Sequence, residues 1–292
     1  MTTPPVADPN QGARGPSRTP TRPAVTVVDA APFPALRYDP AVAGDPASTS
    51  APAYDELERF AYARHRAVSP YTVLELIAPR DSVSYRAAGA TLQRWRRTGV
   101  LVAEPAAAFY RYEMHELRRA TPVVLRGLLA AVRLEPLDGC GEVLAHERVD
   151  QARVHDRLER LEAAPVDLSP LLGLYRQAPE ELANLLAVPP PSPPLAALSD
   201  EAGVDHRVWA LAEPDEVAAV RRWLAGVRVV IGDGHHRYAA ALAFLRRQRA
   251  ARGPAAGTDP PWERTLMYLV DSSQPGLQIL PVHRLVRRLP PD

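Results

Sequence analysis

Apolar side chains recur three and four residues apart along several segments, which is the pattern of amphipathic helices. In the helix expected over residues 236–252, Tyr238, Ala241 and Leu245 fall on one face. Gly253 and Pro254 follow this segment and predict its end. Helices are predicted over residues 54–66, 84–97, 154–164, 214–225 and 236–252.

Shorter apolar runs between these segments indicate strands. Val229, Val230 and Ile231 are contiguous, which is typical of a buried strand. Turn residues at 138–141 and 272–276 separate two pairs of apolar runs, so two antiparallel hairpins are expected. Strands are predicted over residues 74–77, 109–112, 123–134, 142–149, 208–211, 227–231, 266–270 and 277–280, with a further apolar segment at 168–175. Helices and strands together predict an α/β fold with a mixed (α+β) sheet.

One turn joins a predicted buried strand directly to a helix. It consists of Gly232, Asp233, Gly234, His235, His236 and Arg237. Backbone N–H groups lack partners at a helix start, and the helix dipole adds partial positive charge there. Cationic side chains in the first turn are unfavourable by about 0.3–1 kcal/mol each unless an anion offsets them. We therefore predict a phosphate or carboxylate site at this turn.

Asp233 is open to three roles within this turn. It can cap the helix, accept a proton from a substrate hydroxyl, or bind a metal that accompanies a nucleotide phosphate. Asp-Gly pairs are also common in ordinary turns, and histidines at a helix start can simply be solvated. The two flanking glycines, the strand before them and Arg237 after them favour the functional interpretation.

The charged residues narrow the chemistry of this site. With 35 basic and 34 acidic residues the net charge is +1, so no broad surface for nucleic acid or anionic membrane is expected. Every basic residue is an arginine, which excludes a Walker-type lysine, a Schiff base and a lysine general base. The planar guanidinium group favours carboxylate and phosphate as partners. The single cysteine, Cys140, has no partner for a disulfide and lacks the spacing of a zinc site.

The other segments predict the domain organisation. Residues 1–22 are rich in Pro, Thr and Gly without an apolar core, so a disordered tail is expected rather than a secretion signal. Arg126 and Arg133 interrupt the best apolar run, and no run reaches the roughly 20 residues of a membrane helix. One domain is predicted over residues 23–292, with a Pro-rich loop at 188–200. We expect a cytoplasmic protein with a small-molecule substrate and no nucleic-acid or membrane partner, and the oligomeric state stays open.

Two further polar groups follow predicted strands, where sheet proteins often collect functional side chains. His146, Glu147 and Arg148 form the first group, and His283 and Arg284 form the second. If both converge on the Gly-Asp-Gly turn, they supply imidazoles, a carboxylate and arginines for acid–base or phosphoryl chemistry. Half-exposed ion pairs at strand ends are the alternative interpretation.

Seven blocks of the sequence, in order along the chain, suggest a family. They lie at residues 32–39, 51–55, 95–101, 126–127, 146–157, 232–238 and 281–284. They resemble the corresponding blocks of the bacterial and archaeal family catalogued as domain of unknown function 1015. The resemblance implies one family domain without the C-terminal portion that members usually have. It also implies a binding role for Tyr54 and Asp55, although this chain departs there from the usual Pro-Pro-Tyr-Asp of the family.

The turn with Gly234, His235, His236 and Arg237 is also similar to the phosphate-binding turn of the ParB/sulfiredoxin-like superfamily, which includes free-serine kinases, sulfiredoxins and CTP-hydrolysing partition proteins. This similarity implies a ParB/sulfiredoxin-like core with extra strands and helices. It further implies bound ATP or ADP, with Mg²⁺ as a companion ion. The implied catalytic residues are Asp233, Glu147 and His235. The implied phosphate- or substrate-binding residues are Gly232, Gly234, His236, Arg237, His146, Arg148, His283, Arg284, Tyr54 and Asp55.

Several functions stay open at this point. We favour a nucleotide-dependent phosphotransferase or phosphohydrolase that acts on a small polar metabolite, with serine or phosphoserine as one candidate. A non-catalytic nucleotide- or anion-binding switch would share the turn but need no acid–base residue. A metal-dependent hydrolase built from His146, His235, His236 and His283 is a further alternative, but a His-Glu-x-x-His pattern is absent and no resident metal is predicted. DNA binding is least favoured because the charge is balanced.

Overall fold

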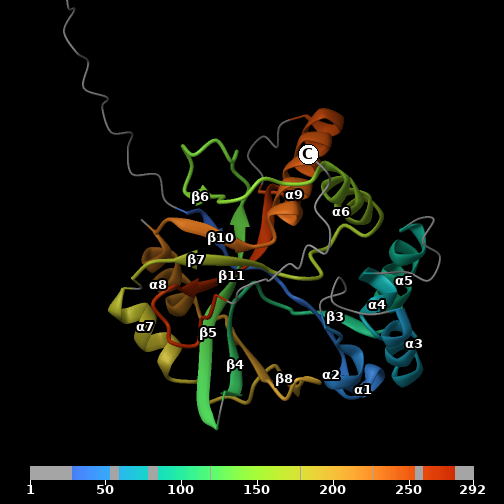
Figure 1. Cartoon of the computed structure of the whole chain (residues 1–292), viewed down its shortest axis with the longest axis horizontal. Helices are drawn as coiled ribbons and strands as arrows, with labels where there is room; N and C mark the ends of the chain where they lie inside the picture. The colour runs from blue at the N-terminus through green and yellow to red at the C-terminus, as the bar shows by residue number, and fades with distance from the viewer. Residues whose placement is uncertain are drawn as a thin grey trace, which may run out of the picture.

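The computed structural model describes residues 28–52, 59–77, 85–118, 120–177, 179–225, 227–253 and 259–279. The predicted tail at 1–22 and four predicted binding residues, Tyr54, Asp55, His283 and Arg284, lie outside these ranges. The described part has a mixed α/β architecture, as predicted, in which helices surround one large sheet (Figure 1).

The large sheet has nine strands in the order β6-β10-β7-β11-β5-β4-β9-β8, and β1 pairs with the far end of β5. It is mixed, because β10 runs parallel to β6 and β11 runs parallel to β7 while the other pairs are antiparallel. The strands are β1 (Ala30–Ala31), β4 (Phe109–Arg118), β5 (Thr121–Arg133), β6 (Val143–Leu144), β7 (Leu171–Tyr175), β8 (Ala196–Ser199), β9 (Asp205–Leu211), β10 (Val229–Asp233) and β11 (Arg264–Asp271).

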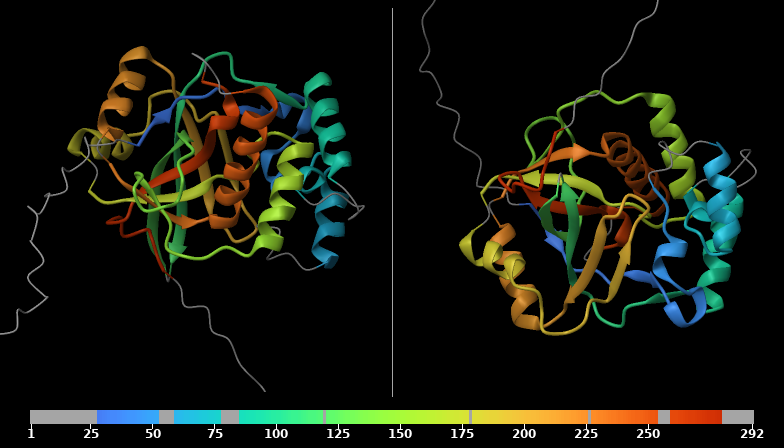
Figure 2. Two further views of the ribbon diagram at one scale, coloured as in Figure 1. Left: turned by 90° about the horizontal axis from the view of Figure 1, so that it is seen from above. Right: turned by 60° about the horizontal axis from the view of Figure 1, so that its bottom comes forward.

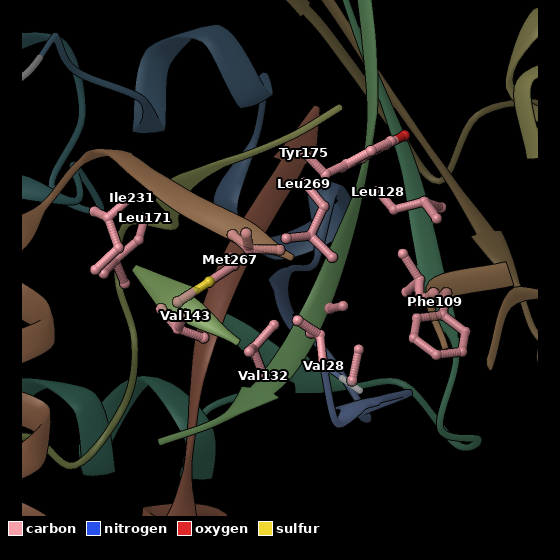
Figure 3. Packing of buried hydrophobic residues seen from close by; sticks show 14 of the residues in the cluster. Val28, Phe109, Leu128, Val132, Val143, Leu171, Tyr175, Ile231, Met267 and Leu269 are labelled. Carbon is pink, nitrogen blue, oxygen red and sulfur yellow. The ribbon is translucent and has the colours of Figure 1, made fainter. Parts of the chain in front are cut away.

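Four longer helices border this sheet. Helices α6 (Gln151–Ala163) and α9 (His235–Arg252) lie side by side, and α7 (Glu180–Ala187) and α8 (Pro214–Leu224) lie on the opposite side of the molecule (Figure 1). Side chains from α7, α8 and α9 join the strands in one hydrophobic core. Figure 3 shows its centre, where Leu171, Ile231, Met267 and Leu269 come together from three neighbouring strands. A short 3-10 helix (Pro261–Glu263) precedes β11.

The N-terminal part forms a smaller unit beside α6 (Figure 2). Its elements are β2 (Leu36–Tyr38), β3 (Leu101–Ala103), α1 (Pro40–Ala43), α2 (Pro46–Thr49), α3 (Arg59–Val68), α4 (Leu74–Ile77) and α5 (Arg86–Arg97). Trp95 is 2% exposed and anchors a separate core with Leu76, Leu92 and Leu101. The Tyr110 hydroxyl on β4 accepts a hydrogen bond from Ala35 N at 2.9 Å and ties this unit to the large sheet.

Three local predictions are wrong, and each has a packing reason. Residues 74–77 form helix α4 rather than a strand, since a four-residue apolar run has too little periodicity to separate the two. The predicted hairpin of 123–134 with 142–149 does not form, because β5 is flanked by β4, β1 and β11. The hairpin of 266–270 with 277–280 does not form over its described residues either: 277–279 are not in a strand, and β11 is already paired with β5 and β7. Helix α7 and strand β8 were missed.

Candidate functional site

The site centres on the point where β10 passes into α9. Gly234 adopts a left-handed conformation with φ of +101° and separates Asp233, the last strand residue, from His235, the first helical residue. No side chain caps the helix, and its first hydrogen bond runs from Tyr238 N to Gly234 O at 2.9 Å. The amides of the preceding residues in the helix are therefore its unpaired donors, as predicted for an anion-binding turn.

Only glycine suits position 234. An L-residue is strained at this φ. A Cβ atom there would also lie 3.0 Å from Leu171 Cγ and 3.1 Å from Arg237 Nη2, tighter than ordinary van der Waals contact. The turn is therefore packed closely against β7 and against its own arginine.

Arg237 holds the turn in place. Its Nη2 atom donates to Asp233 Oδ2 at 2.5 Å. Its Nη1 atom donates to Ser169 Oγ at 2.9 Å and to Pro170 O at 2.7 Å, in the segment before β7. The guanidinium group thus positions the turn, and its charge is directed at the site without being fully available to a ligand.

His235 and Glu147 form a pair beneath the turn. The His235 side chain is 2% exposed, and its Nδ1 atom lies 3.2 Å from Glu147 Oε1. The His146 amide donates to His235 Nε2 at 3.4 Å, so Nε2 is the acceptor and Nδ1 carries the proton that points at Glu147. Burial lowers the pKa of His235, and the nearby Glu147 carboxylate opposes this. The neutral imidazole therefore orients Glu147.

The remaining predicted residues divide into those near the turn and those away from it. His236 Nε2 accepts a hydrogen bond from Asp150 N at 3.0 Å, which links the start of α9 to the cap of α6. The ring of His146 lies 4.5 Å from that of His235, edge to face. Arg148 is exposed and does not line the cavity described next, and Gly232 lies against Leu172 and Leu174 of β7.

A cavity of about 860 Å³ opens above the turn, between α6, α9, β8 and the N-terminal unit. Asp233, Gly234, His235, His236 and Arg237 all line it, together with Glu147. The described residues of its wall also include arginines from β2 and α6. These are Arg37, Arg153, Arg157 and Arg160. The wall thus carries five arginines and two carboxylates, and two of the arginines have carboxylate partners outside the wall, Arg37 with Glu104 and Arg157 with Asp156. The volume of the cavity suits a small organic ligand.

The sequence pointed to Arg237 but missed the arginines of α6. Arg153, Arg157 and Arg160 repeat four and three residues apart, which places them on one side of a helix. That spacing alone predicts a cationic face on this helix. What the sequence did not show is that this side of α6 meets the start of α9 across a cavity.

One group of side chains has the composition of a metal site. Donor atoms of His146, Glu147 and His235 lie within 4.8 Å of one another. A metal bound at His235 Nδ1 would require the proton to move to Nε2, and the His146 amide already donates to Nε2. This donor set therefore fits a His–Glu pair in close contact better than a resident metal ion.

None of the described helices has both the length and the apolar character needed to cross a membrane. No curated protein and no solved structure matches the chain. The similarity of its core to the ParB/sulfiredoxin-like superfamily stays a prediction. A family model does match, over residues 30–291 and thus over most of the chain. The chain therefore belongs to the family described as protein of unknown function DUF1015.

Proposed function

We propose that this protein binds a nucleotide, ATP or ADP, in the cavity above the turn and transfers or hydrolyses a phosphoryl group. The acceptor is a small polar metabolite with a hydroxyl group, or water. One observation carries the proposal: the uncapped start of α9 and five arginines line the same cavity as two carboxylates. Phosphoryl transfer depends mainly on positioning and on neutralisation of charge, and this wall supplies both.

Each side chain has a role in this proposal. The amides at the start of α9 bind the phosphate oxygens of the transferred group, and Arg237 fixes the turn that presents them. Glu147 or Asp233 accepts the proton of the acceptor hydroxyl as its oxygen bonds to phosphorus and the bond to the leaving phosphate oxygen breaks. Asp233 is the carboxylate that this turn offers to a Mg²⁺ ion accompanying the nucleotide.

His235 acts through Glu147. Its Nδ1 atom lies 3.2 Å from Glu147 Oε1, so in this proposal it orients the carboxylate toward the cavity without touching the substrate. Because burial keeps His235 neutral, the pair has one negative charge and can accept a proton.

The test combines binding and turnover for Glu147→Gln and Asp233→Asn. Both substitutions keep the size of the side chain, and a glutamine oxygen can still face His235 Nδ1. Thermal shifts with ATP, ADP and inorganic phosphate measure binding, because a ligand that prefers the folded state raises Tm. At least one variant is expected to lose about 10²-fold or more in turnover, the usual contribution of a general base, while its phosphate binding persists.

A binding-only switch would share the turn and the cavity but not this loss. If nucleotide binds and neither substitution changes the rate of nucleotide consumption, the catalytic proposal is wrong and the switch is favoured. If neither ATP, ADP nor phosphate shifts Tm, the anion site itself is contradicted.

A further inference from the structure

A second set of cations lines the cavity on its α6 side. Val154 and Leu158 of α6 pack against Ala240 and Phe244 of α9. Arg153 and Arg157 each precede one of these packed residues, so they are turned by roughly a quarter of the helix circumference away from the packed seam. Together with Arg160 they line the cavity. The packing of α6 against α9 thus fixes the position of α6, and the adjacent face of α6 presents guanidinium groups to the cavity.

Arg160 has no directly bound counter-charge in the described part of the chain, although the nearby Asp167 and Asp156 carboxylates act on it and raise its pKa. Its guanidinium group forms no hydrogen bond or ion pair with a described residue, although it is only partly exposed. Two arginines of the neighbouring helix α9 do have carboxylate partners, since Arg247 pairs with Glu162 and Arg249 pairs with Glu263. Arg157 has a carboxylate partner in Asp156 at 2.6 Å.

The positive charges also act on one another. Burial lowers the pKa of both Arg157 and Arg160, and the nearby Arg237 lowers both further, while the carboxylates of Asp167 and Asp156 oppose this at Arg160. Like charges held together in a partly buried wall are unfavourable unless an anion lies between them. Arg237 is fixed by its contacts with Asp233 and the segment before β7, so it cannot move away.

The other side of the cavity has a different character. Val73 and Ile77 of the N-terminal unit and Leu195 and Leu198 at β8 contribute apolar side chains there. Arg37 of the same unit also lines the cavity, but it pairs with Glu104. Anionic groups of a ligand are therefore attracted to α6 and α9, and its uncharged part is accommodated opposite.

We propose that Arg157 and Arg160 bind a second anionic group of the ligand, a carboxylate or a further phosphate, separate from the phosphoryl group at the start of α9. This inference rests on the proposed function, and it narrows the ligands to molecules that carry two anionic groups. The planar guanidinium group binds both kinds of anion through paired hydrogen bonds. A carboxylate would belong to the acceptor and a second phosphate to the nucleotide.

Two pairs of probes distinguish these sources by titration calorimetry on the full chain. Inorganic phosphate is compared with pyrophosphate, and O-phosphoethanolamine is compared with O-phosphoserine, which differs from it by one carboxylate. We expect the two-group probe of at least one pair to bind about 10-fold or more tightly than its counterpart, as for one added charge-assisted hydrogen-bonded contact. A preference for pyrophosphate identifies a phosphate subsite, and a preference for O-phosphoserine identifies a carboxylate subsite.

The variants are Arg160→Gln and the double variant Arg157→Gln/Arg160→Gln. Both are expected to reduce that preference, the double variant to within about 3-fold, while inorganic phosphate still binds. Arg246→Gln is the matched control, because Arg246 is exposed on α9, does not line the cavity and carries the same charge. If the double variant does not fold, as judged by circular dichroism, the single variant decides.

Three results would overturn the inference. They are the absence of any preference in the unaltered protein, a preference that the variants leave unchanged, and an equal loss of affinity for one-group and two-group probes. Failure of the unaltered protein to bind inorganic phosphate contradicts the proposed function itself. Phosphate binding combined with indifference to the α6 variants contradicts this inference alone.

Discussion

The starts of α8 and α9 show opposite charge patterns. Helix α8 begins with Pro214 and carries Asp215 and Glu216 in its first turn. Helix α9 begins after an uncapped Gly234, has no acidic residue in its first turn, and carries two histidines and an arginine there. Aspartates also cap other helices, since the side chains of Asp39, Asp45 and Asp150 accept amide hydrogen bonds at the starts of α1, α2 and α6.

This difference supports the proposed anion site at the start of α9. At α8 the protein's own carboxylates offset the positive end of the helix dipole. At α9 the nearest carboxylate in sequence, Asp233, is bound by Arg237 and does not cap the helix. The start of α9 also lines the cavity, whereas no α8 residue does. The positive end of the helix dipole is thus offset by carboxylates at the start of α8 and is left without a capping carboxylate at the start of α9.

The largest expected effect comes from placing a side chain at the start of α9. Gly234→Ala puts a residue into a left-handed conformation and brings its Cβ against Leu171 and Arg237. We expect a loss of about 1–2 kcal/mol in the free energy of unfolding from the backbone alone. We also expect at least about a 10-fold weaker phosphate affinity, because the turn must shift and hydrogen bonds to the anion are lost. Urea unfolding and calorimetry measure the two quantities.

Gly203→Ala is the matched control. Gly203 has a φ of +78° and nothing within 4 Å of the added Cβ, so it carries the backbone strain without the close contacts. We expect a similar loss of stability and an unchanged phosphate affinity. If the folded Gly234→Ala protein binds phosphate as well as the Gly203→Ala protein does, the turn is not the anion site.

The sequence predicted the strand, turn and helix around Gly234 better than it predicted the pairing of the sheet. The Gly-Asp-Gly turn, the strand before it and the helix after it are local, so glycine and periodicity were enough to find them. Strand β5 pairs with three strands, and only β4 is its neighbour along the chain. The pairings with β1 and β11 depend on strands that are distant in sequence, so nearby turn residues suggested wrong hairpins. The α6 arginines were visible in the sequence, but their approach to Arg237 depends on the packing of α6 on α9.

The pH dependence of stability tests whether His235 is neutral at the start of α9, where a positive charge would add to that of the helix dipole. Burial holds the pKa of His235 below its usual 6.5. As the pH falls through 6.5, the unfolded chain therefore takes up a proton before the folded protein does, and stability falls. The contribution is fully present above pH 6.5 and is lost progressively below it, with a slope of at most ~1.4 kcal/mol per pH unit.

His235→Asn removes this proton uptake. The free energy of unfolding is measured in urea between pH 5 and pH 8 for the variant and the unaltered protein, a range that brackets the usual histidine pKa. We expect the variant to be less stable at pH 8 and the difference to shrink as the pH falls. Parallel curves would contradict this expectation, because they would mean that folding leaves the pKa of His235 unchanged.

The smallest expected effect is at the start of α8. Asp215→Asn/Glu216→Gln removes the acidic groups of the first turn and keeps the shapes of both side chains. Each lost charge–dipole interaction is expected to cost about 0.3–1 kcal/mol at low salt and less at high salt, because both groups are near the surface. Phosphate affinity is expected to stay unchanged, since no α8 residue lines the cavity. If stability does not fall at low salt, carboxylates do not offset the dipole in this protein, and the lack of them at α9 no longer argues for a bound anion.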